Sequence, residues 1–263
     1  MAHIDINTIQ AEILLQIDEK RKKLRSMPPL PEDVAQELQE ESVVLHTYHS
    51  NAIEGNTLTL TETHLIITKG ATIEENSPRE NCEAANTAKA FELTETLAET
   101  GEPISHATIR RIHAVVTESI SEDAGNYRRT NIRAIGSTRA SPNWTEVTKR
   151  MNRLLLNVQH SRLHPVETAA FLHQQVIEIH PFKDGNGQVA RLITNLYLLE
   201  QGYPVVLIKR EDRKIYNQYV KLAHSGDFTP FSHFITKAVD ESLTRIFSAY
   251  EGDDELIKEG SLA

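Results

Sequence analysis

Apolar residues recur every three or four positions along most of this chain, which is the spacing of one face of an α-helix. Ile9, Ile13 and Ile17 start the pattern, and the first helix must end before Pro28-Pro29 because proline lacks the backbone N–H that a helix needs. Further helices are predicted over residues 31–54, 59–70, 79–98, 105–118, 145–159, 165–179, 187–200, 211–225 and 230–249. We therefore expect an all-α protein.

Local signals mark where several of these helices begin and end. Thr59 with Glu62 matches a capping box, in which the side chain of each residue accepts a hydrogen bond from the backbone N–H of the other. Gly55, Gly202 and Gly226 stand where a glycine that terminates a helix is expected. The predicted boundaries thus rest on capping chemistry as well as on hydrophobic spacing.

Residues 124–142 break the helical pattern. Gly125 begins the segment, and the apolar residues Ile132 and Ile135 precede a short polar stretch. We interpret the segment as a small hairpin or an ordered loop, and it is the only β-structure expected in the chain. Two neighbouring arginines in it, Arg128 and Arg129, either steer a phosphate or are solvated.

Composition narrows the class of protein. The chain has 263 residues, a formal net charge of −9 and a single cysteine, Cys82. An acidic chain is not drawn to nucleic acid or to an anionic membrane, and no apolar run approaches the roughly 20 residues that span a bilayer. One cysteine excludes an intrachain disulfide. We expect a soluble, cytoplasmic protein with neither nucleic acid nor a membrane as its partner.

The stretch from His180 to Gly187 carries the most chemistry, because an apolar helix ends there and another begins after a turn with two glycines. Gly185 and Gly187 let successive backbone N–H groups face one point, and the positive end of the next helix adds to this anion site. His180 can accept a proton near neutral pH. The carboxylate of Asp184 suits a magnesium ion that bridges phosphates. Arg191, about one turn further on, is within reach of the outer phosphates of a nucleotide.

A plainer interpretation of this stretch stays open on loop chemistry alone. Asp-Gly-Asn-Gly is a common turn, and a histidine that ends a helix is often only a cap. The joint presence of histidine, carboxylate, glycine turn and arginine at this spacing favours the phosphate site.

Residues 180–191, His-Pro-Phe-Lys-Asp-Gly-Asn-Gly-Gln-x-x-Arg, resemble the signature of the Fic (filamentation induced by cAMP) family, His-Pro-Phe-x-Asp/Glu-Gly-Asn-Gly-Arg-x-x-Arg. Gln188 stands where the family pattern has its first arginine, so one positive charge beside the phosphates is missing. The resemblance implies a Fic fold, a helical bundle around a helix–loop–helix core with a small β-hairpin flap. It also implies that AMP is transferred from ATP, with Mg²⁺, to a Ser, Thr or Tyr hydroxyl of a target protein.

The resemblance assigns a role to each matching position. His180 would be the general base that deprotonates the target hydroxyl, Asp184 would bind Mg²⁺, and Arg191 would contact the terminal phosphate. The flap would register the target by main-chain pairing, although an ordinary surface loop is the alternative. Tyr216 matches a position that packs on the adenine base, although a tyrosine on a helix is often a core residue. The other ATP-binding positions that the resemblance implies are Gly185, Asn186, Gly187, Gln188, Ile135, Gly136, Ser137, Thr138 and Asn217.

A second motif lies far upstream. Ser50-Asn51-Ala52-Ile53-Glu54-Gly55 resembles the inhibitory motif Ser/Thr-x-x-x-Glu-Gly/Asn of many Fic proteins. Glu54 at the end of a helix would form a bidentate pair with Arg191 and place negative charge where the terminal phosphate belongs. The plain alternative is that Glu54 is an exposed residue in the turn that ends the helix.

Three functions follow from these motifs. The first is a protein adenylyltransferase that Glu54 inhibits. The second is an enzyme that removes AMP, or does both, with Glu54 positioning a water molecule. The third is a catalytically impaired Fic-fold module that binds a nucleotide or a protein, which only Gln188 favours.

The resemblance also bears on partners and on domain organisation. ATP and a target hydroxyl are the expected partners; the target hydroxyl can be the chain's own, and self-association into a homodimer is common among relatives. We divide the chain into N-terminal helices with the inhibitory motif at 1–55, a Fic core at 56–250 and an acidic flexible tail at 251–263.

Overall fold

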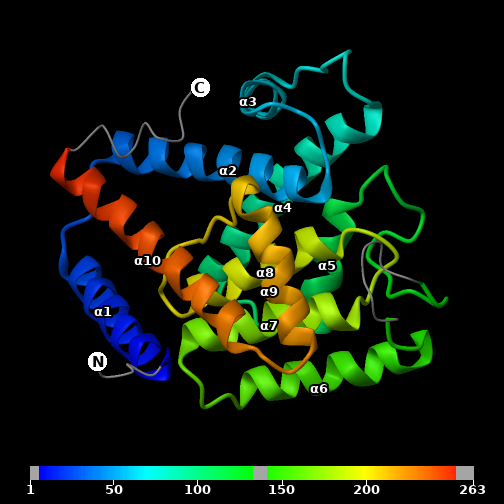
Figure 1. Cartoon of the computed structure of the whole chain (residues 1–263). Coiled ribbons are helices and arrows are strands. Elements are labelled where there is room, and N and C mark those ends of the chain that lie inside the picture. The colour runs from blue at the N-terminus through cyan, green and yellow to red at the C-terminus, as the bar shows by residue number, and fades with distance from the viewer. Residues whose placement is uncertain (1–5, 133–140, 253–263) are drawn as a thin grey trace.

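The computed structural model describes residues 6–132 and 141–252, and its regular structure there is helical (Figure 1). The elements are α1 (Ile6–Ser26), α2 (Glu32–Glu54), α3 (Leu60–Lys69), α4 (Pro78–Thr100), α5 (His106–Val116), η1 (Trp144–Glu146), α6 (Val147–Gln159), α7 (Pro165–Ile179), α8 (Asn186–Glu200), η2 (Arg210–Asp212), α9 (Arg213–His224) and α10 (Thr229–Glu251). The all-α prediction is confirmed, and the described residues contain no β-strand.

Helix α8 runs through the middle of the bundle, with α2, α4, α5 and α7 packed around it (Figure 1). Every residue from Val189 to Leu196 is buried. A helix that is buried all round is fixed by its neighbours on every side. The loop at the N-terminus of α8 is therefore attached to the most constrained element of the fold.

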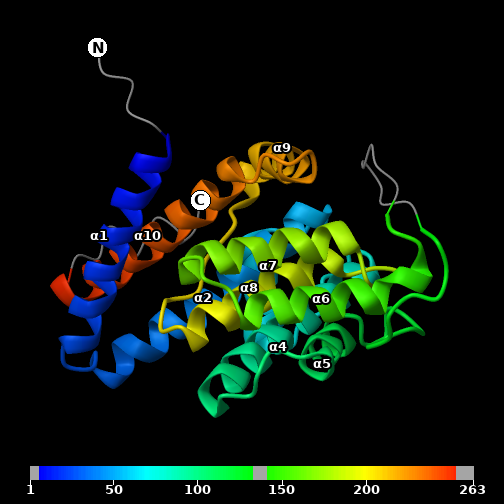
Figure 2. The same ribbon diagram turned by 90° about the horizontal axis from the view of Figure 1, so that it is seen from below.

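Helices α1 and α10 lie side by side on the flank of the bundle away from α5 (Figures 1 and 2). Gln10 Nε2 donates a hydrogen bond to Thr236 Oγ1 at 2.9 Å, and Lys20 pairs with Asp240 at 2.6 Å. The hydroxyl of Tyr203, just after α8, donates to Asp18 at 2.5 Å. These contacts tie the N-terminal helix to the C-terminal one and to the end of the central helix.

The turn between α2 and α4 is held by caps. Gly55 ends α2 with φ +107°, in the region that glycine adopts most readily. The Thr59–Glu62 capping box that the sequence predicts is present at the start of α3. Ser77 and Glu80 form a second box at the start of α4, and the Glu80 carboxylate also accepts a hydrogen bond from Thr57 N–H at 2.8 Å, which ties this turn to the segment that follows α2.

Two predictions fall partly on residues that the structure does not describe. The segment 124–142, expected as a hairpin or an ordered loop, has no strand in its described parts 124–132 and 141–142, and Ile135, Gly136, Ser137 and Thr138 lie outside the described residues. Of the tail predicted at 251–263, Glu251 instead ends α10, and residues 253–263 are not described. None of the described helices is long and apolar enough to cross a bilayer.

Two histidines lie deep in the bundle. His46 is 3% exposed and His173 is fully buried, and burial lowers the pKa of each to about 3. Both rings are therefore neutral in the folded protein at neutral pH. The hydroxyls of Thr194 and Tyr216 flank the ring of His173 at 3.1 and 3.0 Å.

These histidines predict that the protein loses stability on acidification below pH 6.5. The unfolded chain binds protons at its histidines near pH 6.5, whereas folded His46 and His173 bind them only near pH 3. The free energy of unfolding then falls between these values by up to about 1.4 kcal/mol per pH unit for each histidine. Urea unfolding at a series of pH values measures the slope. His173→Gln is expected to flatten it and His64→Gln, at an exposed position, to leave it unchanged; equal slopes in all three proteins contradict the prediction.

Candidate active site

The loop between α7 and α8 is held in one shape by its backbone and by an amide. Pro181 cannot continue α7, and His180 ends that helix in the left-handed region at φ +49°. Gly185 has φ +71°, which costs glycine little. The side chain of Asn186 accepts a hydrogen bond from Phe182 N–H at 2.9 Å and donates one to the Phe182 carbonyl at 3.0 Å. Asn186 thus closes the loop with its side chain, and only its backbone N–H is left for a phosphate.

His113 of α5 packs against the loop between α7 and α8. Its ring stacks on Phe182, with centroids 3.7 Å apart and planes 3° from parallel. Nδ1 accepts a hydrogen bond from Gly125 N–H at 2.9 Å, so the ring proton is on Nε2, which lies 3.2 Å from the carbonyl oxygen of Asp184. Burial lowers the pKa of His113 to about 4, which keeps this ring neutral. No motif in the sequence indicated this role.

Arg128 ties the segment before α6 to the turn at His180. Its side chain donates to the carbonyl oxygens of His180 at 2.8 Å, Thr130 at 3.0 Å and Pro142 at 2.6 Å. Arg128 is 2% exposed, whereas Arg129 is exposed. The sequence left phosphate steering and a solvated side chain open for Arg128, and neither is right. The guanidinium is buried, and its N–H groups donate to backbone carbonyl oxygens.

Arg191 of α8 meets the end of α2. Its side chain is 3% exposed, and its Nη2 donates to Glu54 Oε1 at 2.7 Å. Nε donates to Ser50 Oγ at 2.8 Å, and Nη2 also donates to the Ser50 carbonyl at 3.0 Å. The bidentate pair expected from the sequence is therefore wrong in its geometry. One nitrogen, Nη2, meets one carboxylate oxygen, and Ser50 accepts from Nε and Nη2 on the same edge of the guanidinium.

The carboxylate of Glu54 also lies against the first turn of α8. A Cβ atom added to Gly187 would lie 1.9 Å from Glu54 Oε1 and 3.3 Å from Arg191 Nη1. Gly187 has no positive φ, so glycine provides space here and not the conformational freedom that we expected of it. Negative charge at the positive end of a helix is stabilised. Glu54 thus lies beside the anion site that the glycine turn predicts.

The interface between α2 and α8 is polar around Gln188. Gln188 is 7% exposed and donates to Asn51 Oδ1 at 3.4 Å, and Thr87 Oγ1 donates to the same oxygen at 3.0 Å. Asn51 Nδ2 and Arg191 Nη1 are buried and have no hydrogen-bond partner among the described residues. Buried donors without partners are costly, and these two remain available to a further acceptor.

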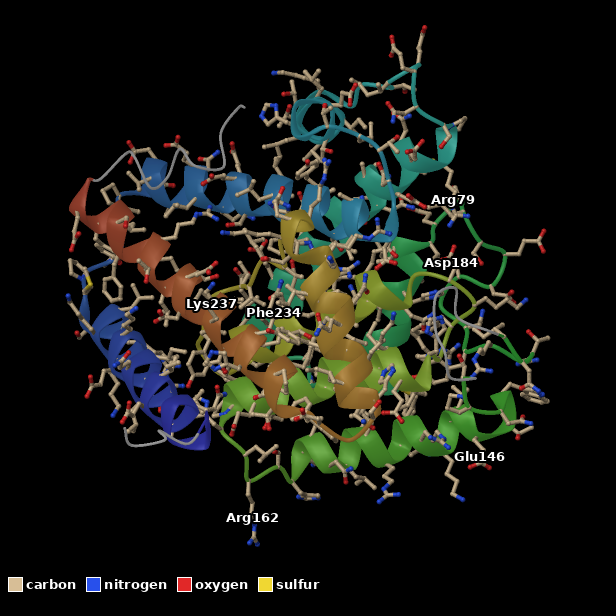
Figure 3. The ribbon with its side chains drawn as sticks, in the orientation of Figure 1. Arg79, Glu146, Arg162, Asp184, Phe234 and Lys237 are labelled. Carbon is tan, nitrogen blue, oxygen red and sulfur yellow. The ribbon has the colours of Figure 1, made fainter. Side chains whose placement is uncertain are left out.

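Asp184 has both carboxylate oxygens engaged. Oδ1 accepts a hydrogen bond from Gly185 N–H at 2.8 Å, and Oδ2 accepts one from Nη2 of Arg79, which reaches down from the first turn of α4 (Figure 3). Burial alone would raise the pKa of Asp184, but the hydrogen bonds from Arg79 and Gly185 outweigh it and the pKa is lowered. Asp184 is therefore ionised. Arg79 lies 105 positions away in the sequence, which gave no signal for this pair.

The donor set around Asp184 fits a magnesium ion that a nucleotide would share. In the described ranges 6–132 and 141–252, no three carboxylate, histidine or cysteine side chains gather as a metal site made only of protein would require. Magnesium is commonly held by one or two carboxylates, with phosphate and water oxygens completing the shell. One ionised carboxylate beside a helix N-terminus meets that description.

One cavity of about 1160 Å³ brings most of the predicted residues in the described ranges together, although Ser50 and Arg191 do not line it. His180, Asp184, Glu54 and Gly187 line it, and α9 supplies a further wall with Asn217. A cavity of this size admits a nucleotide. The structure thus joins positions that lie far apart in the sequence.

Tyr216 fits both interpretations from the sequence. It is 4% exposed and contacts His173 and Phe231 in the core, yet it also lines the cavity. The core contacts fix the ring in the wall of the cavity.

His180 is a neutral base within this cavity. Burial lowers its pKa below the usual 6.5 and the charge of Arg128 contributes, while a hydrogen bond with the Ile177 backbone and the carboxylates of Glu54 and Asp184 act the other way. A neutral imidazole has a lone pair that can accept a proton.

Residues 103–198 match the family model described as Fic/DOC family. Over 243 residues the chain is 35% identical to a protein adenylyltransferase Fic from Nematostella vectensis, and the alignment covers 90% of this chain and 56% of the relative. A protein adenylyltransferase Fic from Culex quinquefasciatus is 32% identical over 231 residues, with 87% of this chain and 46% of the relative covered. The chain spans about half the length of the curated relatives it matches.

Solved structures share the fold. A Fic domain containing signaling protein from Bacteroides thetaiotaomicron is 28% identical with a TM-score of 0.82, over 91% of this chain and 98% of that chain. Fic-1 from C. elegans is 28% identical with a TM-score of 0.85, over 94% of this chain and 74% of that chain. The helical arrangement of this chain is therefore similar to theirs almost throughout.

The buried position of Arg128 predicts a large effect of its removal. Arg128→Leu leaves three carbonyl oxygens without their donor and should lower the free energy of unfolding by about 3 kcal/mol. Arg129→Leu, at the exposed neighbouring position, should change it by less than about 0.5 kcal/mol. Urea denaturation of both variants and the wild type checks the prediction, and equal effects of the two substitutions would refute it.

Proposed function

Because this chain belongs to the Fic family, we propose that it is a protein adenylyltransferase that transfers AMP from ATP to a Ser, Thr or Tyr hydroxyl of a target protein, and that Glu54 inhibits it. The observation that supports this most is that one cavity is lined by a neutral histidine, an ionised aspartate and the N-terminal turn of α8. In this proposal the histidine is the base, the aspartate is the metal ligand and the helix N-terminus binds the phosphates.

The chemistry follows from these positions. His180 accepts the proton of the target hydroxyl as the hydroxyl oxygen attacks the α-phosphorus of ATP. A P–O bond forms to the target, the bond between the α-phosphorus and the bridging oxygen breaks, and pyrophosphate leaves. Backbone N–H groups at the start of α8, beside Gly185 and Gly187, bind the phosphates. Asp184 would hold magnesium, which supplies charge stabilisation to the phosphate oxygens when bound.

Inhibition by Glu54 rests on the contact with Arg191. The Glu54 carboxylate pairs with Arg191 Nη2 at 2.7 Å and lies over Gly187. A terminal phosphate that binds Arg191 must replace this carboxylate, since like charges cannot share the site. Glu54 therefore keeps ATP from the pose in which His180 faces the α-phosphate.

How the target protein binds, and which partners the chain has, are inferred from the resemblance alone. A hairpin flap with Ile135, Gly136, Ser137 and Thr138 would align the target segment by main-chain pairing. Modification of the chain itself, a homodimer and a cytoplasmic location belong to the same proposal.

Removal of AMP is a second candidate function. The Glu54 side chain is 43% exposed and lines the same cavity as His180. A carboxylate there can orient a water molecule toward a bound AMP ester, and a protonated His180 can return the proton to the leaving hydroxyl.

Replacement of the glutamate tests the proposal. Glu54→Gly should raise incorporation of labelled AMP from ATP into the protein by about tenfold or more, because Arg191 becomes free for the terminal phosphate. Mass spectrometry after incubation with ATP and Mg²⁺ measures the gain. Glu40→Gly, a change of the same kind at an exposed position of α2, should leave incorporation at the wild-type level.

The Glu54→Gly variant also distinguishes AMP transfer from the two alternative functions. Adding His180→Ala to Glu54→Gly should abolish incorporation. If Glu54→Gly binds ATP without any incorporation, the impaired-module function is favoured. If wild type but not Glu54→Gly releases AMP from a modified protein, removal of AMP is an activity of this site.

The lowered pKa of His180 predicts the pH dependence. The base must be unprotonated, so the rate in Glu54→Gly should be constant at and above pH 7 and fall about tenfold per unit at lower pH, with a midpoint below 6.5. A pH–rate profile with saturating ATP checks this, and a midpoint clearly above 6.5 would contradict a neutral His180.

A further inference from the structure

Arg79 pairs with the same carboxylate that a metal ion would need. Its guanidinium meets Asp184, the carboxylate that the proposed function gives to magnesium (Figure 3). Lys183, the other cation next to Asp184 in the sequence, pairs with Asp123. An ion that binds Asp184 would therefore leave Lys183 paired and deprive Arg79 of a partner.

The local structure keeps Arg79 at the cavity by other means. Its Nε donates to Glu83 Oε1 at 2.8 Å, and the second oxygen of Glu83 accepts from Asn56 Nδ2 at 3.0 Å. Arg79 lies in the first turn of α4, where the positive end of the helix disfavours a cation. Its side chain is 56% exposed and lines the cavity. Arg79 is thus a half-exposed cation that Glu83 keeps at the cavity, where its position favours contact with anions.

We propose that Arg79 exchanges partners when nucleotide binds: it leaves Asp184 to the metal ion and binds an outer phosphate oxygen of the nucleotide. This inference rests on the proposed function. Gly185 N–H and Arg79 together engage both oxygens of Asp184, so an ion at this carboxylate meets a guanidinium already there, and the two positive charges repel. Glu83 holds the displaced guanidinium within the same cavity.

The exchange also accounts for the missing arginine of the motif. Gln188 is uncharged, buried and bonded to Asn51 of α2, so it adds no charge to the phosphate site. A charge-assisted hydrogen bond is about twice as strong as a neutral one. Arg79 of α4, which lines the same cavity, supplies that charge instead.

Calorimetry separates the phosphate contact from mere damage to the site. In a Glu54→Gly, His180→Ala background, which cannot turn ATP over, Arg79→Gln should weaken Mg·ATP binding about tenfold. AMP lacks the outer phosphates, so its affinity should not change. Manganese binding without nucleotide, followed by its electron paramagnetic resonance signal, should tighten because Asp184 is no longer paired.

The matched control is Arg111→Gln, since Arg111 is 57% exposed and pairs with Glu102 away from the cavity. It should alter none of the three affinities, and Arg79→Lys should weaken ATP less than Arg79→Gln does. Unchanged ATP affinity in Arg79→Gln, or an equal loss for AMP, overturns the exchange. That result would leave ATP binding and AMP incorporation by Glu54→Gly intact, whereas failure of the proposed function removes the incorporation itself.

Discussion

A guanidinium that is 3% exposed inside a helical bundle must have an anion and hydrogen-bond acceptors nearby. Arg191 is that group, and α8 holds it at the centre of the fold. Ser50 and Glu54 at the end of α2 accept hydrogen bonds from its Nε and Nη2, which ties α2 to α8. The packing of the end of α2 against α8, and with it the proposed inhibition, thus depends on what pairs with one buried arginine.

Further polar contacts connect the end of α2 with Asp184. The turn after Glu54 is bonded to the first turn of α4 through Asn56 and Glu83, and Glu83 also holds Arg79. Arg79 in turn pairs with Asp184. Glu54, which we propose inhibits the site, and Asp184, which would bind metal, therefore lie at the two ends of one series of polar contacts, each paired with an arginine. A carboxylate thus lies beside the proposed phosphate site, and a guanidinium pairs with the proposed metal ligand.

Local chemistry allowed much of the fold to be predicted from the sequence, because caps and hydrophobic spacing act over a few residues. Residues 165–179 were predicted to the residue, and the Thr59–Glu62 box was recognised. The motifs likewise indicated which residues gather at the cavity. What escaped prediction depends on distant contacts: Arg79 with Asp184, and Arg128 with the carbonyl oxygens around His180. In the sequence Arg79 is one polar residue in the first turn of a helix, and nothing near it indicates that folding brings Asp184 to it.

The central claim is that Glu54 and a terminal phosphate compete for Arg191. Crystal structures of the wild type and of Glu54→Gly with magnesium and a non-hydrolysable ATP analogue test it directly. We predict that Glu54 stays on Arg191 in the wild type and that the terminal phosphate lies elsewhere, whereas in Glu54→Gly the phosphate bonds to the guanidinium. A terminal phosphate already bonded to Arg191 in the wild type, with Glu54 unmoved beside it, would contradict the account.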